Sequence, residues 1–302
     1  MSLLEGKTAL VFGVANNRSI AWGITQALHK HGATIGISYA GEVLERRAKP
    51  LAESIGCTFV EPCDITKDEE IEQIVAKAAD KFGQIDILVH SIAFANREEL
   101  IGPYYNTSRE GFHLAMDISV FSFTALAKAF QPMIRPGGSL LTITMQSDRL
   151  FPGYNVMGVA KAALDASVMY LANDFGPQGI RVNAISAGPI RTLAAMGVGT
   201  FKRMYKHFAE MAPMRQNITT EDVGNAAVFL SSPSGNSTSF CHSPFGMTAR
   251  TAVHSCRQES GHLRGDREFE RRLLRFMVVR GSGSSEPRDY RARSTAGRSS
   301  GH

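Results

Sequence analysis

Cysteine is scarce in this chain of 302 residues, and the spacing of its four cysteines is not that of a metal site. They are Cys57, Cys63, Cys241 and Cys256. Long apolar runs are also missing, because no stretch approaches the roughly 20 apolar residues of a membrane-spanning helix. The N-terminus has no basic start, long apolar run or cleavage site of a secretory signal. These absences predict a cytoplasmic protein with reduced thiols, no metal site and no membrane segment.

Lysine is absent from residues 233–302, which hold 12 arginines and 6 acidic residues. Residues 1–232 hold 21 basic and 22 acidic residues, so the net charge of +5 comes from the end of the chain. We therefore predict two parts: a globular body over residues 1–232 and a low-complexity tail over residues 233–302. The tail is rich in Arg, Ser and Gly and is expected to be largely disordered.

Short apolar runs alternate with long amphipathic stretches through the body. This alternation is typical of βαβ units, which form a parallel sheet with helices on both faces. The sequence therefore predicts an α/β fold, with a Rossmann-type doubly wound parallel sheet in a single domain. The expected strands are 8–12, 34–39, 58–62, 85–90, 139–144 and 181–185. The expected helices begin after an N-cap at Ser19 and then cover 42–55, 69–82, 108–131 and 155–175.

Several residues with binding potential come directly after an expected strand. They are Gly13, Asp64, Ser91, Ile92, Thr144 and Gly188. Because ligands of parallel sheets bind beyond the carboxyl ends of the strands, these positions predict a site. The turn 13–19 has one glycine where the dinucleotide fingerprint has three, but the helix start at Ser19 and Ile20 suits a diphosphate. The alternatives are an ordinary turn at Gly13 and a helix cap at Asp64.

Tyr154 and Lys161 stand seven residues apart, which is two turns of the expected helix, so both side chains can share one face. A cation near a phenol favours its ionised form and makes the hydroxyl a better hydrogen-bond and proton donor. On this interpretation, Lys161 keeps the local potential positive and makes the Tyr154 hydroxyl a better donor. The alternative is a pair of neighbours on a solvated helix face.

Taken together, these residues resemble the short-chain dehydrogenase/reductase superfamily, and within it the bacterial enoyl-acyl-carrier-protein reductases. The step of seven residues from Tyr154 to Lys161 marks enoyl reductases, whereas most of the superfamily has a step of four. The matching stretches lie in residues 1 to about 232: GVANNRSIAWGI (13–24), HSIAFA (90–95), MDIS (116–119), YNVMGVAKAAL (154–164), GIRVNAISAGPIRTLAA (179–195) and EDVGNAA (221–227). The resemblance implies fatty-acid synthesis, a homotetramer, and a substrate carried by acyl carrier protein.

The resemblance also implies roles for single residues. Tyr154 looks like the catalytic tyrosine, which also contacts substrate, and Lys161 like the lysine that holds the nicotinamide ribose. The positions that match cofactor contacts are Gly13, Ser19 and Ile20 at the pyrophosphate, Asp64 and Ile65 at the adenine, and Ile92 beside the cofactor. Ala95 matches a substrate contact. The loop that closes over nicotinamide and acyl chain begins at Ile190, Thr192, Leu193 and Ala194. Met196, Phe201 and Met204 offer an acyl-chain surface or are plain packing.

The expected cofactor is NADH, with NADPH less favoured. The segment after the second strand, 39–42, has no acid immediately placed for a ribose 2′-hydroxyl. Arg46 and Arg47 are the cations nearest in sequence for a 2′-phosphate, and the helix 42–55 is expected to point them to solvent.

Two departures from the family pattern stand out. The family has a second tyrosine ten residues before the catalytic one, where this chain has Thr144 or Met145. Neither side chain replaces a phenol, which puts substrate orientation and full activity in question. After Ser232 the family's last strand is missing from the sequence, so we expect an exposed sheet edge and little loss of stability when residues 233–302 are removed. We interpret this tail as an out-of-frame translation; the alternative is a basic arm for nucleic acid or anionic lipid.

Two further functions stay open at this point. A 3-oxoacyl-acyl-carrier-protein reductase belongs to the same superfamily, but the step of seven residues and the absence of a clear serine before Tyr154 argue against it. A nucleotide-binding protein without turnover is the other alternative, because the second tyrosine is missing.

Overall fold

The structure is a computed structural model that describes residues 2–145, 150–236, 238–239 and 242–244. The chain divides into a first unit, Met1–Ser255, and a second unit, Cys256–His302. The fold and the candidate site lie in the first unit. The predictions for Cys241, Cys256, the loop 146–149 and the disordered end of the tail fall outside the described residues.

Seven parallel strands form one sheet in the order β3-β2-β1-β4-β5-β6-β7. The strands are β1 (Thr8–Phe12), β2 (Thr34–Tyr39), β3 (Phe59–Pro62), β4 (Ile85–His90), β5 (Ile134–Thr144), β6 (Arg181–Ser186) and β7 (His242–Pro244). The reversal of strand order between β1 and β4 is that of a doubly wound Rossmann-type sheet. The predicted fold class is therefore confirmed.

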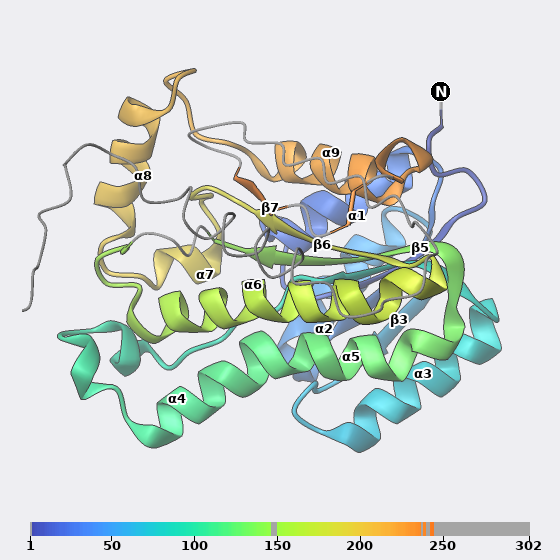
Figure 1. Ribbon diagram of the computed structural model, residues 1–302, viewed down its shortest axis with the longest axis horizontal. Helices are drawn as coiled ribbons and strands as arrows, with labels where there is room; N and C mark the ends of the chain where they lie inside the picture. Colours follow the sequence, from blue (N-terminus) through green and yellow to red (C-terminus); the bar gives the residue numbers. More distant parts are fainter. Residues whose placement is uncertain (1, 146–149, 237, 240–241, 245–302) are drawn as a thin grey trace, which may run out of the picture. The chain divides into compact units, whose positions relative to one another are not determined.

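Helices cover both faces of the sheet (Figure 1). They are α1 (Ile20–Lys30), α2 (Gly41–Glu53), α3 (Asp68–Phe82), α4 (Arg109–Met116), α5 (Ser122–Phe130), α6 (Asn155–Phe175), α7 (Leu193–Met196), α8 (Phe201–Met211) and α9 (Thr220–Ser231). The short 3₁₀ turns are η1 (Arg97–Leu100), η2 (Tyr104–Asn106), η4 (Gln131–Met133), η5 (Gly176–Gln178) and η6 (Pro233–Gly235). The predicted helix 108–131 is interrupted, because a π-helical turn, η3 (Asp117–Phe121), separates α4 from α5.

Side chains of successive strand residues enter two separate cores, as the two-residue period of a strand requires. Ala9 and Val11 of β1 pack with α1, α2 and α9, whereas Leu10 and Phe12 pack with α3, α5 and α6. Because both faces of the central strands are buried, these strands are continuous apolar runs in the sequence. Among the described residues, no helix has the length and apolar character needed to cross a membrane.

Strand β7 corrects the prediction that the sheet lacks its last strand. Its three residues pair with β6 in parallel, with Ala184 opposite His242. Two side chains of β6 also hold the segment before β7: Arg181 Nη1 donates to Gly235 O at 3.1 Å, and Asn183 Nδ2 donates to Thr238 O at 2.9 Å. The sequence did not reveal this strand because it is short and is held by backbone contacts rather than by an apolar pattern. Removal of residues 233–302 is therefore expected to destabilise the sheet, contrary to the prediction from sequence.

Candidate active site

The turns after β1 and β4 are packed against each other, and this contact requires glycine at position 13. Gly13 has φ +101°, and a Cβ built there would be 2.1 Å from Ser91 O and 3.3 Å from Ile92 Cγ1. A positive φ and a close backbone neighbour both favour glycine. The structure thus brings Gly13 and Ile92 together at the carboxyl ends of the two central strands.

The N-terminus of α1 starts directly after this turn. Ser19 is its N-cap, as predicted: Ser19 Oγ accepts from Trp22 N at 3.2 Å and donates to Asn16 O at 2.8 Å. No acidic residue lies in the first turn of α1. The positive end of the helix dipole at Ile20 is therefore free of a competing carboxylate, which suits a diphosphate.

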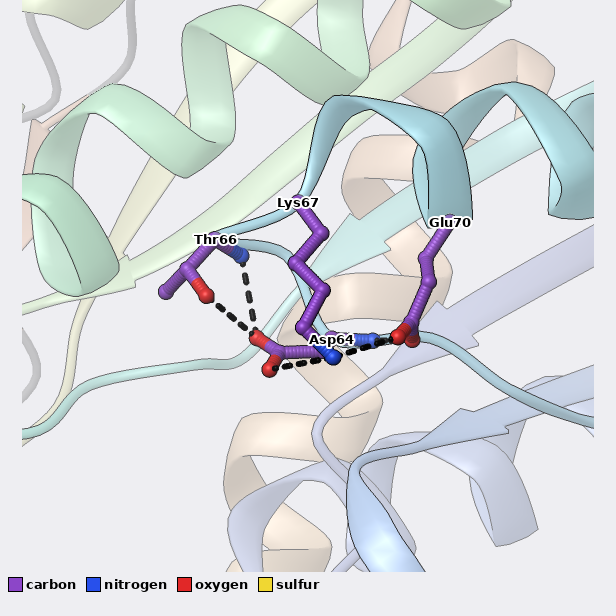
Figure 2. A network of polar contacts seen from close by, with 4 residues as sticks. All are labelled: Asp64, Thr66, Lys67 and Glu70. Atoms are coloured by element: carbon purple, nitrogen blue, oxygen red, sulfur yellow. Dashed lines mark hydrogen bonds and ion pairs between the residues drawn. The ribbon is translucent and has the colours of Figure 1, made fainter.

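Asp64 belongs to a polar network after β3, which Figure 2 shows with Thr66, Lys67 and Glu70. Asp64 Oδ1 accepts from Thr66 N at 3.1 Å and from Thr66 Oγ1 at 2.7 Å. Glu70 accepts from Asp64 N at 2.6 Å and from Lys67 Nζ at 2.8 Å, and Lys67 Nζ lies 3.6 Å from Asp64 Oδ2. The alternative of Asp64 as a helix cap is wrong, because Lys67 is the N-cap of α3.

The network keeps Asp64 ionised. Burial raises the pKa of its carboxyl group, but the hydrogen bonds from Thr66 and the charge of Lys67 outweigh burial and hold that pKa below its usual value. Asp64 is thus an anionic acceptor at neutral pH, which fits the predicted contact with an adenine amine. The neighbouring Ile65 is buried and its side chain packs in the core on the α3 side of the sheet.

A pocket of about 680 Å³ lies beside this network, at the carboxyl ends of β2 and β3. Its lining includes four carboxylates and two lysines: Glu42, Glu45, Asp64, Glu70, Lys67 and Lys77. Arg46 and Arg47 are exposed and do not line it, in agreement with their predicted direction. The size is that of a small-molecule site, and the excess of negative charge disfavours a phosphate.

Tyr154 and Lys161 both lie on or beside α6, with Tyr154 as its N-cap and Lys161 buried within it. Burial raises the pKa of the Tyr154 phenol to about 12. Lys161 Nζ donates to Ile143 O of β5 at 2.7 Å. That Lys161 makes the phenol a better donor stays a prediction. Burial lowers the pKa of Lys161 to about 8, although Asp165 opposes this shift. At pH 7 the site therefore holds a neutral phenol and a lysine that is still largely protonated.

The predicted lid begins after β6 and is tied to the segment before Tyr154. Ile190 is buried, and Thr192 is the N-cap of α7, where its hydroxyl accepts from Ala195 N at 3.1 Å. Leu193 and Ala194, the first residues of α7, are exposed. Thr200 Oγ1 donates to Pro152 O at 2.7 Å, which links the lid to that segment.

The three candidate residues for an acyl-chain surface, Met196, Phe201 and Met204, differ in their burial. Met196 is exposed and stays available for an apolar ligand, whereas Phe201 is buried and packs on Tyr205 with ring centroids 5.6 Å apart. Met204 is partly buried. The plain-packing alternative is therefore correct for Phe201.

A buried network around His90 is not predicted by any pattern in the sequence. His90 Nδ1 lies 2.8 Å from Thr142 Oγ1, and its Nε2 lies 2.8 Å from Ser122 Oγ. Because Ser122 Oγ donates to Ile118 O at 2.7 Å, it accepts from His90 Nε2–H, and Nδ1 accepts from Thr142. Burial, and then the charge of Lys161, lower the pKa of His90 to about 3, so the ring stays neutral. The network fixes the π-helical turn against β4 and β5.

The π-helical turn also places Ser119 against the loop after β4. Ser119 Oγ accepts from Phe94 N at 3.0 Å and donates to Phe94 O at 3.1 Å. This fixes the backbone next to Ala95, the predicted substrate contact. Sequence reasoning missed Ser119 because an apolar pattern does not distinguish a π-helical turn from a continuous helix. At the position of the family's second tyrosine, Thr144 is buried and Met145 is partly buried.

Comparison with known proteins gives one consistent result. The family described as "Enoyl-(Acyl carrier protein) reductase" matches residues 13–239. The enoyl-acyl-carrier-protein reductase (NADH) FabI of Bacillus cereus is 52% identical over 233 residues, which cover 76% of this chain and 91% of that protein. FabI of Rickettsia prowazekii is 49% identical over 229 residues, which cover 76% of this chain and 88% of that protein.

Solved structures of the same kind superpose well. The Bacillus cereus reductase in complex with NADP⁺ and indole naphthyridinone has a TM-score of 0.78 and 50% identity, covering 80% of this chain and 95% of that chain. The Anaplasma phagocytophilum reductase in complex with NAD has a TM-score of 0.76 and 44% identity, covering 79% of this chain and 91% of that chain. This chain belongs to the enoyl-(acyl carrier protein) reductase family of the short-chain dehydrogenase/reductase superfamily.

Proposed function

We propose that this protein is an NADH-dependent enoyl-acyl-carrier-protein reductase of type II fatty-acid synthesis. It would reduce the double bond of a trans-2-enoyl thioester on acyl carrier protein. The observation that carries the proposal is the pair Tyr154 and Lys161 on α6, beside the carboxyl ends of the strands, in a chain about half identical to NADH-dependent reductases.

The chemistry assigned to the two residues follows from their protonation. NADH, when bound, supplies a hydride to the β-carbon of the thioester. Tyr154 stays un-ionised at neutral pH and is a hydrogen-bond donor for the thioester oxygen as negative charge develops there. A donor of this kind typically lowers the barrier by about 3–4 kcal/mol. We assign Lys161, which is still largely protonated at neutral pH, to the nicotinamide ribose.

The residues at the N-terminus of α1 and after β3 suit the pyrophosphate and adenine parts of the cofactor. The N-terminus of α1 at Ser19 and Ile20, with no carboxylate in its first turn, suits the pyrophosphate together with Gly13. We assign Asp64, whose lowered pKa keeps it ionised, as the acceptor for the adenine amine. The acidic lining of the adjacent pocket favours a neutral 2′-hydroxyl over a 2′-phosphate, which supports NADH over NADPH.

Self-association is part of the proposal. Large apolar side chains are exposed along η3 and α6, where Phe121 is 57% exposed and Tyr170 is 74% exposed. Exposed apolar surface of this kind favours contact with another protein chain. We assign it to a cytoplasmic homotetramer and expect light scattering to give four times the mass of the chain. A monomer at micromolar concentration would contradict this assignment.

The test of function is oxidation of NADH with two short thioesters. We expect turnover with crotonyl thioester and none with acetoacetyl thioester. Turnover with acetoacetyl thioester alone would identify a 3-oxoacyl reductase. Binding of NADH by calorimetry without turnover of either substrate would identify a nucleotide-binding protein and would give the missing second tyrosine, at Thr144 or Met145, a functional meaning.

A further inference from the structure

Asn155, the first residue of α6, has an unusual backbone conformation. Its φ is +38°, and Arg215, with φ +54°, is the only other non-glycine residue with positive φ among the described residues. A positive φ is uncommon outside glycine, although asparagine tolerates it better than most residues. Asn155 directly follows Tyr154, so this conformation sets the direction of the chain next to the phenol.

The side chain of Asn155 is tied to a distant loop. Its Nδ2 donates to Gly102 O at 3.1 Å, and Gly102 lies between η1 and η2. Gly102 itself has φ +78°. The hydrogen bond therefore joins the start of α6 to a loop 53 residues earlier in the chain.

The residue on the other side of Tyr154 is equally constrained. Gly153 has φ +78°, and a Cβ built there would be 2.9 Å from Thr200 Oγ1. Tyr154 N donates to Phe151 O at 3.0 Å, and Tyr154 O accepts from Met157 N at 2.9 Å. Tyr154 thus lies in a short turn that is fixed by the lid on one side and by Asn155 on the other.

We propose that Asn155 is a positioning residue that sets the direction of the Tyr154 phenol. The proposal rests on the catalytic role assigned to Tyr154 above. Two properties of asparagine matter here: its tolerance of a positive φ and its amide donor to Gly102. Loss of either one lets the first turn of α6 relax and displaces the phenol from the thioester oxygen.

The experiment compares three substitutions in the full-length chain. Asn155→Ala removes both properties, Asn155→Gly keeps the backbone freedom and loses the donor, and Asn155→Asp tolerates the backbone and loses the donor. We expect Asn155→Ala to lower kcat by roughly 10- to 100-fold, as misplaced catalytic groups do, while KM for NADH changes less than about twofold. The other two variants should retain more activity than Asn155→Ala.

Arg215 provides the matched control, because Arg215→Ala meets the same backbone problem at a position outside the proposed site. We expect Arg215→Ala and Arg215→Gly to change the melting temperature and to leave kcat within about twofold of wild type. Calorimetry of NADH binding to Asn155→Gly checks that the site of this variant is folded, and we expect NADH to bind.

Full kcat in Asn155→Ala would overturn the inference, as would a loss of activity that only parallels the loss of stability in the Arg215 variants. Tyr154→Phe is measured in the same assay. If Tyr154→Phe keeps full turnover, the role of Tyr154 is wrong; if it loses turnover while Asn155→Ala keeps it, only the inference fails.

Discussion

The two ends of the proposed cofactor site differ in how far their charged side chains are exposed to water. At the adenosine end, the side chains of Asp64, Lys67 and Glu70 are 40%, 57% and 31% exposed and pair with one another. At the catalytic end, Lys161 is only 6% exposed and donates to the backbone carbonyl of Ile143. The ions of one end remain in water, whereas the cation of the other end is largely removed from it.

This difference explains the opposite directions of the pKa shifts. Lys67 gains a hydrogen bond and the charge of Glu70, so its pKa is raised. Burial dominates at Lys161 and lowers its pKa to about 8. Exposed pairs contribute little energy but hold groups in place for binding. A buried cation costs stability and supplies a strong local field. We therefore assign binding to the adenosine end and chemistry to the catalytic end.

Lys161→Met, which removes the buried cation of the catalytic end, is expected to have a large effect on both stability and activity. The pKa of Lys161 is lower in the folded chain than in the unfolded chain, so the unfolded chain holds the proton more tightly. The resulting penalty is complete below about pH 8 and disappears as pH rises toward 10.5. Its removal, less one lost hydrogen bond, should raise the free energy of unfolding at pH 7 by about 1–3 kcal/mol.

The same variant should lose activity, with kcat/KM for NADH lowered by at least roughly 100-fold, because a charge contact in the site is lost. Urea unfolding at pH 7 and at pH 10, together with steady-state kinetics, measures both quantities. A variant that is less stable than wild type at pH 7 would contradict the account of a buried, costly cation.

The pH dependence of the wild type gives the next effect in size. If protonated Lys161 is required, kcat/KM for NADH should fall as pH rises through about 8, by roughly tenfold per unit well above it. Asp64 is ionised throughout this range, because its pKa is lowered. Rates measured from pH 5 to pH 10 check this. If kcat/KM for NADH stayed constant to pH 10, activity would not depend on the protonation of Lys161, and the account would be contradicted.

The smallest effect is expected at the adenosine end. Asp64→Asn should raise KM for NADH by roughly three- to tenfold and leave kcat unchanged, because a charged acceptor is lost but not the catalytic groups. Lys67→Met is the control: it removes an exposed ion-pair partner and should change KM by less than about threefold. A fall in kcat for Asp64→Asn would contradict the assignment of binding to the adenosine end and of chemistry to the catalytic end.

The sequence predicts the sheet well, because strands buried on both faces are continuous apolar runs between amphipathic helices. It also places Gly13, Ser19 and Asp64 at strand ends or helix starts, where local chemistry indicates a ligand. It does not predict the pKa of Tyr154, since that value depends on burial and on the direction of the Lys161 side chain, which turns to β5. Such three-dimensional contacts have no counterpart in residue spacing.

Other misses have the same cause. Strand β7 is defined by its pairing with β6, and the π-helical turn η3 by its hydrogen bonds, so neither carries an apolar signature. In the sequence, Asn155 is only the second residue of the motif YNVMGVAK, with no predicted role of its own. Its positive φ and its bond to Gly102 become visible only in the fold.

The central claim, that chemistry resides at the buried end, is tested most directly by Tyr154→Phe in single-turnover reduction of crotonyl thioester by NADH. The account predicts that the rate of NADH oxidation falls by roughly 100- to 1000-fold, the loss of one donor to a developing oxyanion. The dissociation constant of NADH should stay within about twofold of wild type, because the adenosine end is untouched. A full rate of NADH oxidation in Tyr154→Phe would contradict the assignment of the chemistry to this end of the site.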